Sequence, residues 1–293
     1  MPTYDTPTPI DLAINLLVGG IEVFAGDRAD TVVTVSASDP AKALDCRGAE
    51  ETNVEFDGQR VTIVGPRPRI SWIGPRESVD LKVELPRGSR LTAEIGFGSL
   101  RTVGRLGATR IKSSYGPVDV DTTGDLWLHA SYGNVTLGTA EGGIEITAGF
   151  GQIRVGTVTG DAILKASHRP ILVGESGGNV DAKLSGGDLE ITKARASVAV
   201  MTAYGNIQLR EVSSGSIQVE SGWGQVTIGV RPGVPAWLDL SAKDGHVRNQ
   251  LAGDRAPDAS EQTVAVRART QHGDINIQRA PSIRATKRGE RHT

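Results

Sequence analysis

Two acidic and two basic side chains occupy related positions of a sequence repeat and are candidates for acid–base chemistry: Glu145, Asp181, Lys165 and Lys183. Enzymes that cleave polysaccharides use a pair of carboxylates to move protons at the glycosidic bond. Two periods of eighteen residues separate Glu145 from Asp181, so stacked repeats would hold them about 9.6 Å apart, with Ile163 between. A carbohydrate-active enzyme is therefore one hypothesis, and scattered surface charge is the favoured explanation.

An aromatic residue followed by glycine recurs with the same period. Five residues of this column could form a ladder: Phe97, Tyr115, Tyr132, Phe150 and His168. The column is interrupted at Gly186 and resumes with Tyr204 and Trp223. Packing at a corner of the fold is the favoured interpretation. The alternative is a stripe that binds sugar rings or bases. The residues three positions after each repeat glycine are mixed in character and not basic, which disfavours nucleic acid.

Four apolar residues are expected to point outward if strand alternation holds. They are Trp127, Ile163, Leu172 and Met201. Together they would form an apolar patch for a partner protein or for a second copy of the chain. Cover by an N-terminal strand or loop explains them equally well.

Other chemistry finds no support in the sequence. The Gly-x-Gly strings precede strands rather than helices, so they do not indicate a nucleotide site. The five histidines show no spacing typical of metal ligands. We expect no cofactor and no metal. A net charge of −2 gives no strong signal for nucleic acid or membrane, which leaves an unknown protein or glycan as the expected partner.

Composition points to a reducing compartment. The single cysteine, Cys46, excludes an intrachain disulfide framework. The N-terminal residues show neither a secretory leader nor an apolar run long enough to span a bilayer. We therefore expect a cytoplasmic protein.

The repeat itself predicts the fold. Apolar residues alternate in two short segments per period, and glycines such as Gly124, Gly142 and Gly160 mark the corners between them. One such turn cannot bury its inward residues, whereas stacked turns bury a continuous column. The sequence predicts an all-β protein, a parallel β-solenoid (β-helix) with about eighteen residues per turn, an irregular N-terminal β segment and a disordered basic C-terminal tail.

Four regions follow from this pattern. Residues 1–9 are expected to form a flexible arm, and 10–95 a set of strands that caps the solenoid and is continuous with it. Residues 39–52 are interpreted as a loop. The repeats occupy 96–278, and 279–293 form the basic tail. The irregular segments 39–78 and 248–262 are candidate caps for the two ends.

The reiterated Gly-x-Val/Ile-x-Val/Ile units resemble a bacterial family of β-strand-repeat proteins of unknown function, often labelled as candidate adhesins. Examples are Gly116-Pro-Val-Asp-Val, Gly133-Asn-Val-Thr-Leu and Gly205-Asn-Ile-Gln-Leu. The resemblance covers about residues 20–277. It implies a repeat fold and an adhesive or scaffolding role, and it carries no catalytic residues.

The sequence as a whole favours a non-enzymatic β-solenoid that serves as a binding or scaffold module with an unknown ligand. A carbohydrate-active β-helix enzyme of the polysaccharide lyase or hydrolase type is the first alternative. A self-assembling filament is the second, because unpaired end turns expose strand edges that favour a homo-oligomer unless they are capped.

Overall fold

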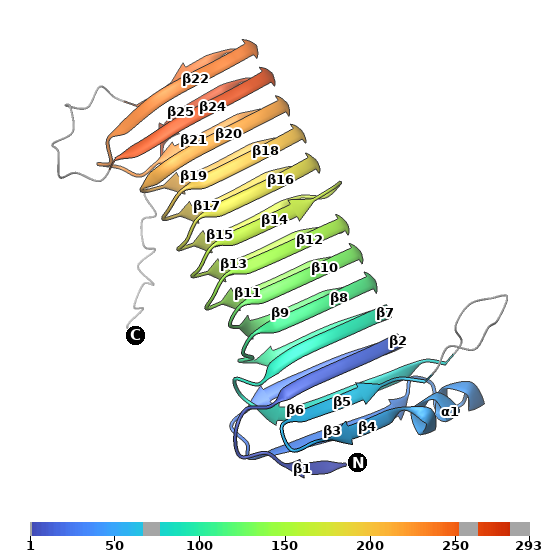
Figure 1. Ribbon diagram of the computed structural model, residues 1–293. Coiled ribbons are helices and arrows are strands. Elements are labelled where there is room, and N and C mark those ends of the chain that lie inside the picture. The colour runs from blue at the N-terminus through green and yellow to red at the C-terminus, as the bar shows by residue number, and fades with distance from the viewer. Residues whose placement is uncertain (1, 67–76, 252–262, 282–293) are drawn as a thin grey trace, which may run out of the picture.

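The chain is a parallel β-solenoid. The computed structural model describes residues 2–66, 77–251 and 263–281, which form one helix and 25 strands. Figure 1 shows the strands stacked as rungs, from the N-terminal strands at the bottom to β22 at the top. Each regular rung contributes one strand to each of two sheets, joined at a corner. This arrangement confirms the predicted β-solenoid and its period of about eighteen residues. One short helix is the exception to the predicted all-β class.

The first sheet holds the strand that precedes the corner. Its regular members are β8 (Thr109–Tyr115), β10 (Leu126–Tyr132), β12 (Ile144–Phe150), β14 (Ala162–Ala166), β16 (Val180–Gly186), β18 (Val198–Tyr204) and β20 (Gly215–Trp223). The second sheet holds β9 (Val118–Thr123), β11 (Val135–Ala140), β13 (Ile153–Val158), β15 (Ile171–Ser176), β17 (Leu189–Ala194), β19 (Ile207–Val212) and β21 (Val226–Val230). Successive strands pair in parallel and in register, so Leu126 lies beside Ile144.

Alternate residues of every regular strand point into the solenoid. Val135, Ile153 and Ile171 occupy one inward column on successive rungs, and all three are fully buried. Burying one such side chain stabilises the fold by about 1.5–3 kcal/mol. Along each strand, the residues that alternate with these inward ones face outward, because successive side chains of a strand point to opposite faces.

Two features hold the corners at the rung spacing. Glycines allow the backbones to approach, as at Gly116, where φ is +129° and a Cβ would lie 1.8 Å from the carbonyl oxygen of Gly98. Side-chain oxygens also bond to the next rung. Asn134 Oδ1 accepts the backbone N–H of Gln152 at 3.0 Å, so corner donors that leave the strand ladder remain paired.

The N-terminal rungs do not follow chain order. Strand β2 (Asp11–Gly26) is inserted between β7 (Arg90–Gly104) on one side and both β5 (Arg60–Val64) and β6 (Val79–Pro86) on the other. All these pairings are parallel. Region 10–95 is therefore continuous with the solenoid and contributes rungs of its own, and the boundary predicted at residue 96 falls inside β7.

Antiparallel strands cover the N-terminal end of the stack. Strand β3 (Asp30–Ala37) pairs with β6, β4 (Asn53–Phe56) pairs with β5, and β1 (Thr3–Asp5) pairs with β3. The flexible arm predicted at 1–9 is wrong, because β1 joins this sheet. A buried hydrogen bond of 2.8 Å between the hydroxyls of Thr6 and Thr31 fixes the segment that follows.

The loop predicted at 39–52 is also wrong. It contains the helix α1 (Ala43–Glu51), which lies beside the N-terminal strands in Figure 1. The helix has no apolar stripe of its own, so its periodicity gave no signal. Buried Asp45 holds it in place, because its carboxylate accepts the backbone N–H groups of Asp39 and Ser78 at 3.2 and 3.0 Å.

The C-terminal rungs are interleaved as well. Strands β24 (Val264–His272) and β25 (Ile275–Arg279) lie between the β20–β21 rung and the rung formed by β22 (Ala236–Asp244) and β23 (Val247–Asn249). The inward residues of β22 are half-buried. Residues 252–262 of the predicted cap and 282–293 of the predicted tail lie outside the described residues.

Candidate functional site

The five predicted ladder residues form one continuous ring stack at the corner. Each ring is parallel to the next within 6°, and the centroid distances from Phe97 to His168 are 4.8, 4.7, 4.9 and 4.7 Å. The rung spacing of about 4.8 Å imposes this geometry, because equivalent residues of parallel in-register strands lie side by side.

The stack exposes the edges of its rings. Phe97, Tyr115, Tyr132 and Phe150 are 43–50% exposed. Their faces are covered by one another, since neighbouring rings stack face to face. A sugar that packs on an aromatic residue needs an open face, so the interior of the ladder is a poor platform for it. At one end of the stack Phe97 pairs in register with Val18, whereas at the other end the column continues with Gly186, which carries no ring.

The column resumes above Gly186. Tyr204 and Trp223 follow in register, and the indole of Trp223 stacks on His272 at 3.8 Å. His272 was not predicted as a ladder residue. The signal was present in the sequence, because His272-Gly273 repeats the pair formed by an aromatic residue and glycine. The insertion of β24 beside β20 brings it to the next rung.

The four residues of the enzyme hypothesis lie on the outer face of the first sheet. Lys165 Nζ is 3.3 Å from Glu145 Oε1, and the side chains of the pair are 47% and 40% exposed. Asp181 lies two rungs from Glu145, with Ile163 between them. Exposed ion pairs contribute about 0–1 kcal/mol. The arrangement is an open surface rather than a cleft that excludes water from a substrate.

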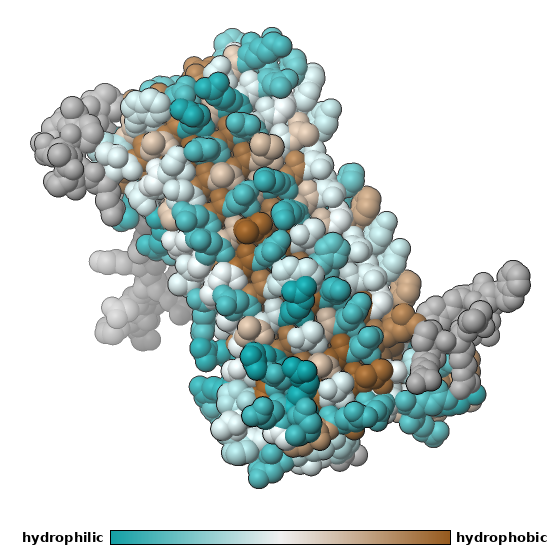
Figure 2. All heavy atoms as spheres, in the orientation of Figure 1, coloured by the Kyte–Doolittle hydropathy of each residue, from teal (hydrophilic) through white to brown (hydrophobic). Residues whose placement is uncertain are grey.

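The four predicted outward apolar residues do not form one patch. Trp127, Ile163 and Met201 lie on the first sheet, but Leu172 belongs to β15 in the second. Glu145 separates Trp127 from Ile163, and Lys183 precedes Met201 in its column. On the face seen in Figure 2, hydrophilic side chains interrupt the hydrophobic ones. The expected patch is therefore broken by charge.

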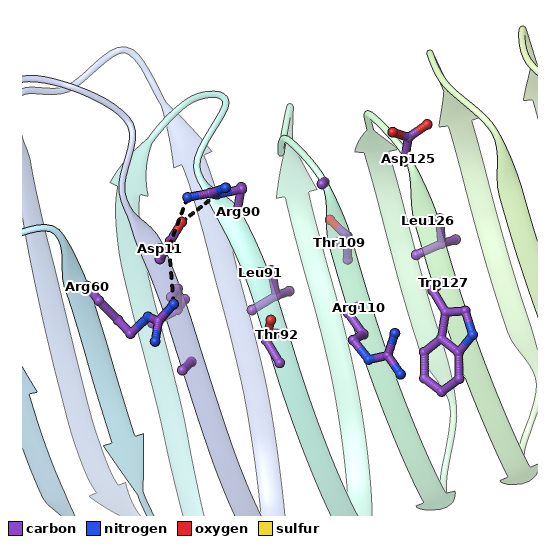
Figure 3. A pocket seen from close by; sticks show the side chains of 13 residues that line it. Asp11, Arg60, Arg90, Leu91, Thr92, Thr109, Arg110, Asp125, Leu126 and Trp127 are labelled. Atoms are coloured by element: carbon purple, nitrogen blue, oxygen red, sulfur yellow. Dashed lines mark hydrogen bonds and ion pairs between the residues drawn. The ribbon is translucent and has the colours of Figure 1, made fainter.

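A shallow groove of about 550 Å³ lies at the N-terminal end of the first sheet. Figure 3 shows Arg110 and Trp127 side by side on neighbouring strands. The guanidinium carbon of Arg110 is 3.8 Å from the centroid of the Trp127 indole, which is a cation–π contact. The groove is also lined by the short side chains of Ala13 and Thr92 and by two further arginines, Arg60 and Arg90. Sequence reasoning missed the groove, although the interval of seventeen residues from Arg110 to Trp127 is one repeat.

Asp11 organises the opposite side of the groove. Its carboxylate accepts hydrogen bonds from Arg90 at 2.5 and 2.9 Å and from Arg60 at 3.4 Å. These contacts join β2 to β5 on one side and to β7 on the other (Figure 3). Arg110, by contrast, is exposed and forms no ion pair with any acidic side chain of the described residues.

The family model for Toastrack DUF4097 matches residues 11–292. The chain belongs to the Toastrack DUF4097 family. No curated protein matches it.

Two solved structures resemble this Toastrack chain. One is a candidate cell adhesion protein from Clostridium sporogenes, with 13% identity, a TM-score of 0.20 and coverage of 94% of each chain. The other is a candidate adhesin from Bacteroides fragilis, with 9% identity, a TM-score of 0.28 and coverage of 94% of this chain and 95% of that one. At such low identities and TM-scores, the adhesion role named for those two proteins is not transferred to this chain.

Charged pairs shift pKa values at the ends of the solenoid. A hydrogen bond from Lys82, together with one from Arg28, holds the pKa of Glu84 below its ordinary value. At the other end, the backbone N–H of His246 and the nearby Arg248 lower the pKa of Asp274. Glu84 thereby links β6 to the segment after β2, Asp274 links the turn before β25 to the turn before β23, and both carboxylates lie outside the groove.

The described residues contain no group of three or more His, Cys, Asp or Glu side chains placed to hold a metal ion. In the same ranges, no helix of this Toastrack chain is long and apolar enough to cross a membrane. The cytoplasmic location stays a prediction.

Proposed function

We propose that this chain is a non-enzymatic binding module, in which the rigid solenoid holds a carboxylate-bearing ligand in the groove beside Arg110 and Trp127. The observation that carries the proposal is the contact of 3.8 Å between the Arg110 guanidinium and the indole, with the donors of that guanidinium left unpaired by acidic groups of the described residues. A planar guanidinium binds a carboxylate through two parallel hydrogen bonds.

The groove is organised before any ligand arrives. Trp127 fixes the plane of Arg110, and Asp11 holds Arg90 and Arg60 on the other side. Because these side chains are already ordered, little conformational entropy is lost when a ligand binds. A uronate-containing glycan and an acidic peptide present the same carboxylate chemistry, so both match the glycan or protein partner expected from the sequence.

Binding of oligouronates and of an oligoglutamate peptide to the full chain tests the proposal. Arg110→Ala and Trp127→Ala should each weaken binding of the recognised ligand at least tenfold. Arg154→Ala is the matched control, because Arg154 is an exposed arginine on the second sheet. An equal loss in Arg154→Ala, or no binding of either acidic ligand to the wild type, would contradict the proposal.

Two competing functions have weaker support. The enzyme hypothesis needs Glu145 and Asp181 to act across an exposed surface on which Lys165 already pairs with Glu145. The filament hypothesis needs the C-terminal rung of one copy to stack on the N-terminal end of another. Strands β3 and β4 run antiparallel to the solenoid there and interrupt such a parallel stack.

A further inference from the structure

The aromatic ladder has one empty position. Gly186 occupies the ladder column between His168 and Tyr204, and it pairs in register with Tyr204. The rung that contains it, β16 and β17, has no aromatic residue. Two rung spacings, about 9.6 Å, therefore separate the ladder positions on either side of the gap.

The backbone does not require glycine at this position. A Cβ added at Gly186 would have Ser167 O and Tyr204 O as its nearest atoms, at ordinary contact distances of 3.6 and 4.0 Å. Its neighbour Gly187 differs, because φ is +104° and a Cβ would lie 2.8 Å from the carbonyl of Arg169. Gly187 is therefore required by the close backbone approach at the corner, whereas the backbone at Gly186 has room for a side chain.

The neighbouring rings define the shape of that space. Tyr132 lies between Tyr115 and Phe150 at centroid distances of 4.7 and 4.9 Å, which is the arrangement that one ring in the gap would adopt. The ring of His168 is parallel to Phe150 within 6°, so its second face is directed at the gap. Tyr204 is 61% exposed and stacks with no other ring of the described residues.

We propose that the gap at Gly186 is a binding slot for one aromatic side chain, phenylalanine or tyrosine, of a partner protein, which completes the ladder from outside. The ladder sets the size of the occupant, because each of its own members at this spacing, from Phe97 to His168, carries one single ring. The exposed edges of the neighbouring rings show that such a side chain enters from solvent. This slot rests on the proposed binding function and is separate from the groove at Arg110.

Selection of random peptides displayed on phage against the full chain tests the slot. Gly186→Phe fills the gap from within, and Gly186→Ala is the matched control that adds a methyl group. Enriched peptides should share one aromatic residue. They should bind Gly186→Phe at least tenfold more weakly than the wild type and bind Gly186→Ala within about twofold. Replacing their aromatic residue by leucine should cause the same loss.

A second variant keeps the test valid if Gly186→Phe misfolds. His168→Ala combined with Tyr204→Ala removes the rings on the two rungs that flank the gap and should abolish binding of the same peptides. Peptides that bind wild type and Gly186→Phe equally overturn the slot while leaving a binding function intact. Failure to enrich aromatic peptides, or saturable binding of adenosine that Gly186→Phe abolishes, overturns the assignment to a protein side chain. The response of Arg110→Ala to acidic ligands reports independently on the proposed function.

Discussion

Asp274 accepts the backbone N–H of His246 at 2.9 Å, although His246 lies 28 residues earlier in the chain. The bond exists because β25 is inserted beneath β23, so the later strand forms the inner rung. The same bond, with the charge of Arg248, lowers the pKa of Asp274 below its ordinary value of 3.8.

Acid should therefore loosen the C-terminal rung. A carboxylate whose pKa is lowered by folding stabilises the native state above its unfolded pKa, and the stabilisation disappears as pH falls through the folded pKa. Asp274→Asn keeps an oxygen acceptor, as Asn134 shows elsewhere, but does not titrate. The difference in urea midpoint between wild type and Asp274→Asn should shrink between pH 7 and pH 3. An unchanged difference would show that the charge of Asp274 contributes nothing.

The corner glycines should tolerate no side chain. At Gly133, φ is +143° and a Cβ would lie 1.9 Å from the carbonyl oxygen of Gly116. Gly133→Ala should lower the free energy of unfolding by more than about 2 kcal/mol, because the rungs must separate. Gly186→Ala, where the space is open, should change it by less than about 0.5 kcal/mol. Urea denaturation followed by circular dichroism measures both, and equal effects would contradict the argument.

The carboxylates of the enzyme hypothesis, Glu145 and Asp181, should be dispensable for both stability and ligand binding. Glu145→Ala combined with Asp181→Ala removes one exposed ion pair with Lys165, so the free energy of unfolding should fall by at most about 1 kcal/mol. Binding of acidic ligands in the groove should not change. An assay of new reducing ends and of unsaturated products on neutral and acidic polysaccharides checks the alternative. Wild-type turnover that the double variant lacks would restore the enzyme hypothesis.

Assembly should stop at a dimer. The N-terminal end is covered by β1, β3, β4 and α1, whereas Leu238 and Leu240 of the end rung β22 are half-buried. A single self-complementary end closes on itself as a two-fold pair. Sedimentation velocity over a range of concentrations should show monomer and at most dimer, and Leu240→Lys should remove the dimer. Long rods that grow with concentration would support a filament instead.

The period of eighteen residues was sufficient to predict the solenoid, its inward columns and the stacking of Phe97 to His168. In a parallel in-register stack, residues one period apart must be neighbours, so sequence spacing converts directly into contacts. The same rule applied to Arg110 and Trp127 would have found the groove. The outward column that contains Trp127 also includes Arg110 and Thr92 on the two preceding rungs, and these residues line the groove.

The ends of the solenoid could not be predicted in this way. The insertion of β2 beside β7 and of β24 beside β20 depends on pairing between distant segments, which leaves no periodic signal. Helix α1 was missed because Asp45, rather than an apolar stripe, fixes it. The apolar patch failed because Leu172 alternates outward on the second sheet, while the other three residues do so on the first.

The interleaved ends change how the molecule would carry a mechanical load. In a solenoid wound in simple chain order, tension on either terminus peels away an edge strand, one hydrogen bond at a time. Here the pull reaches β25 from one end and, beyond the short β1, β2 from the other, and each of these strands has partners on both sides. Two ladders must shear together before either strand leaves. The strands that receive the load first therefore lie inside the stack, and the topology should make the whole solenoid resist tension.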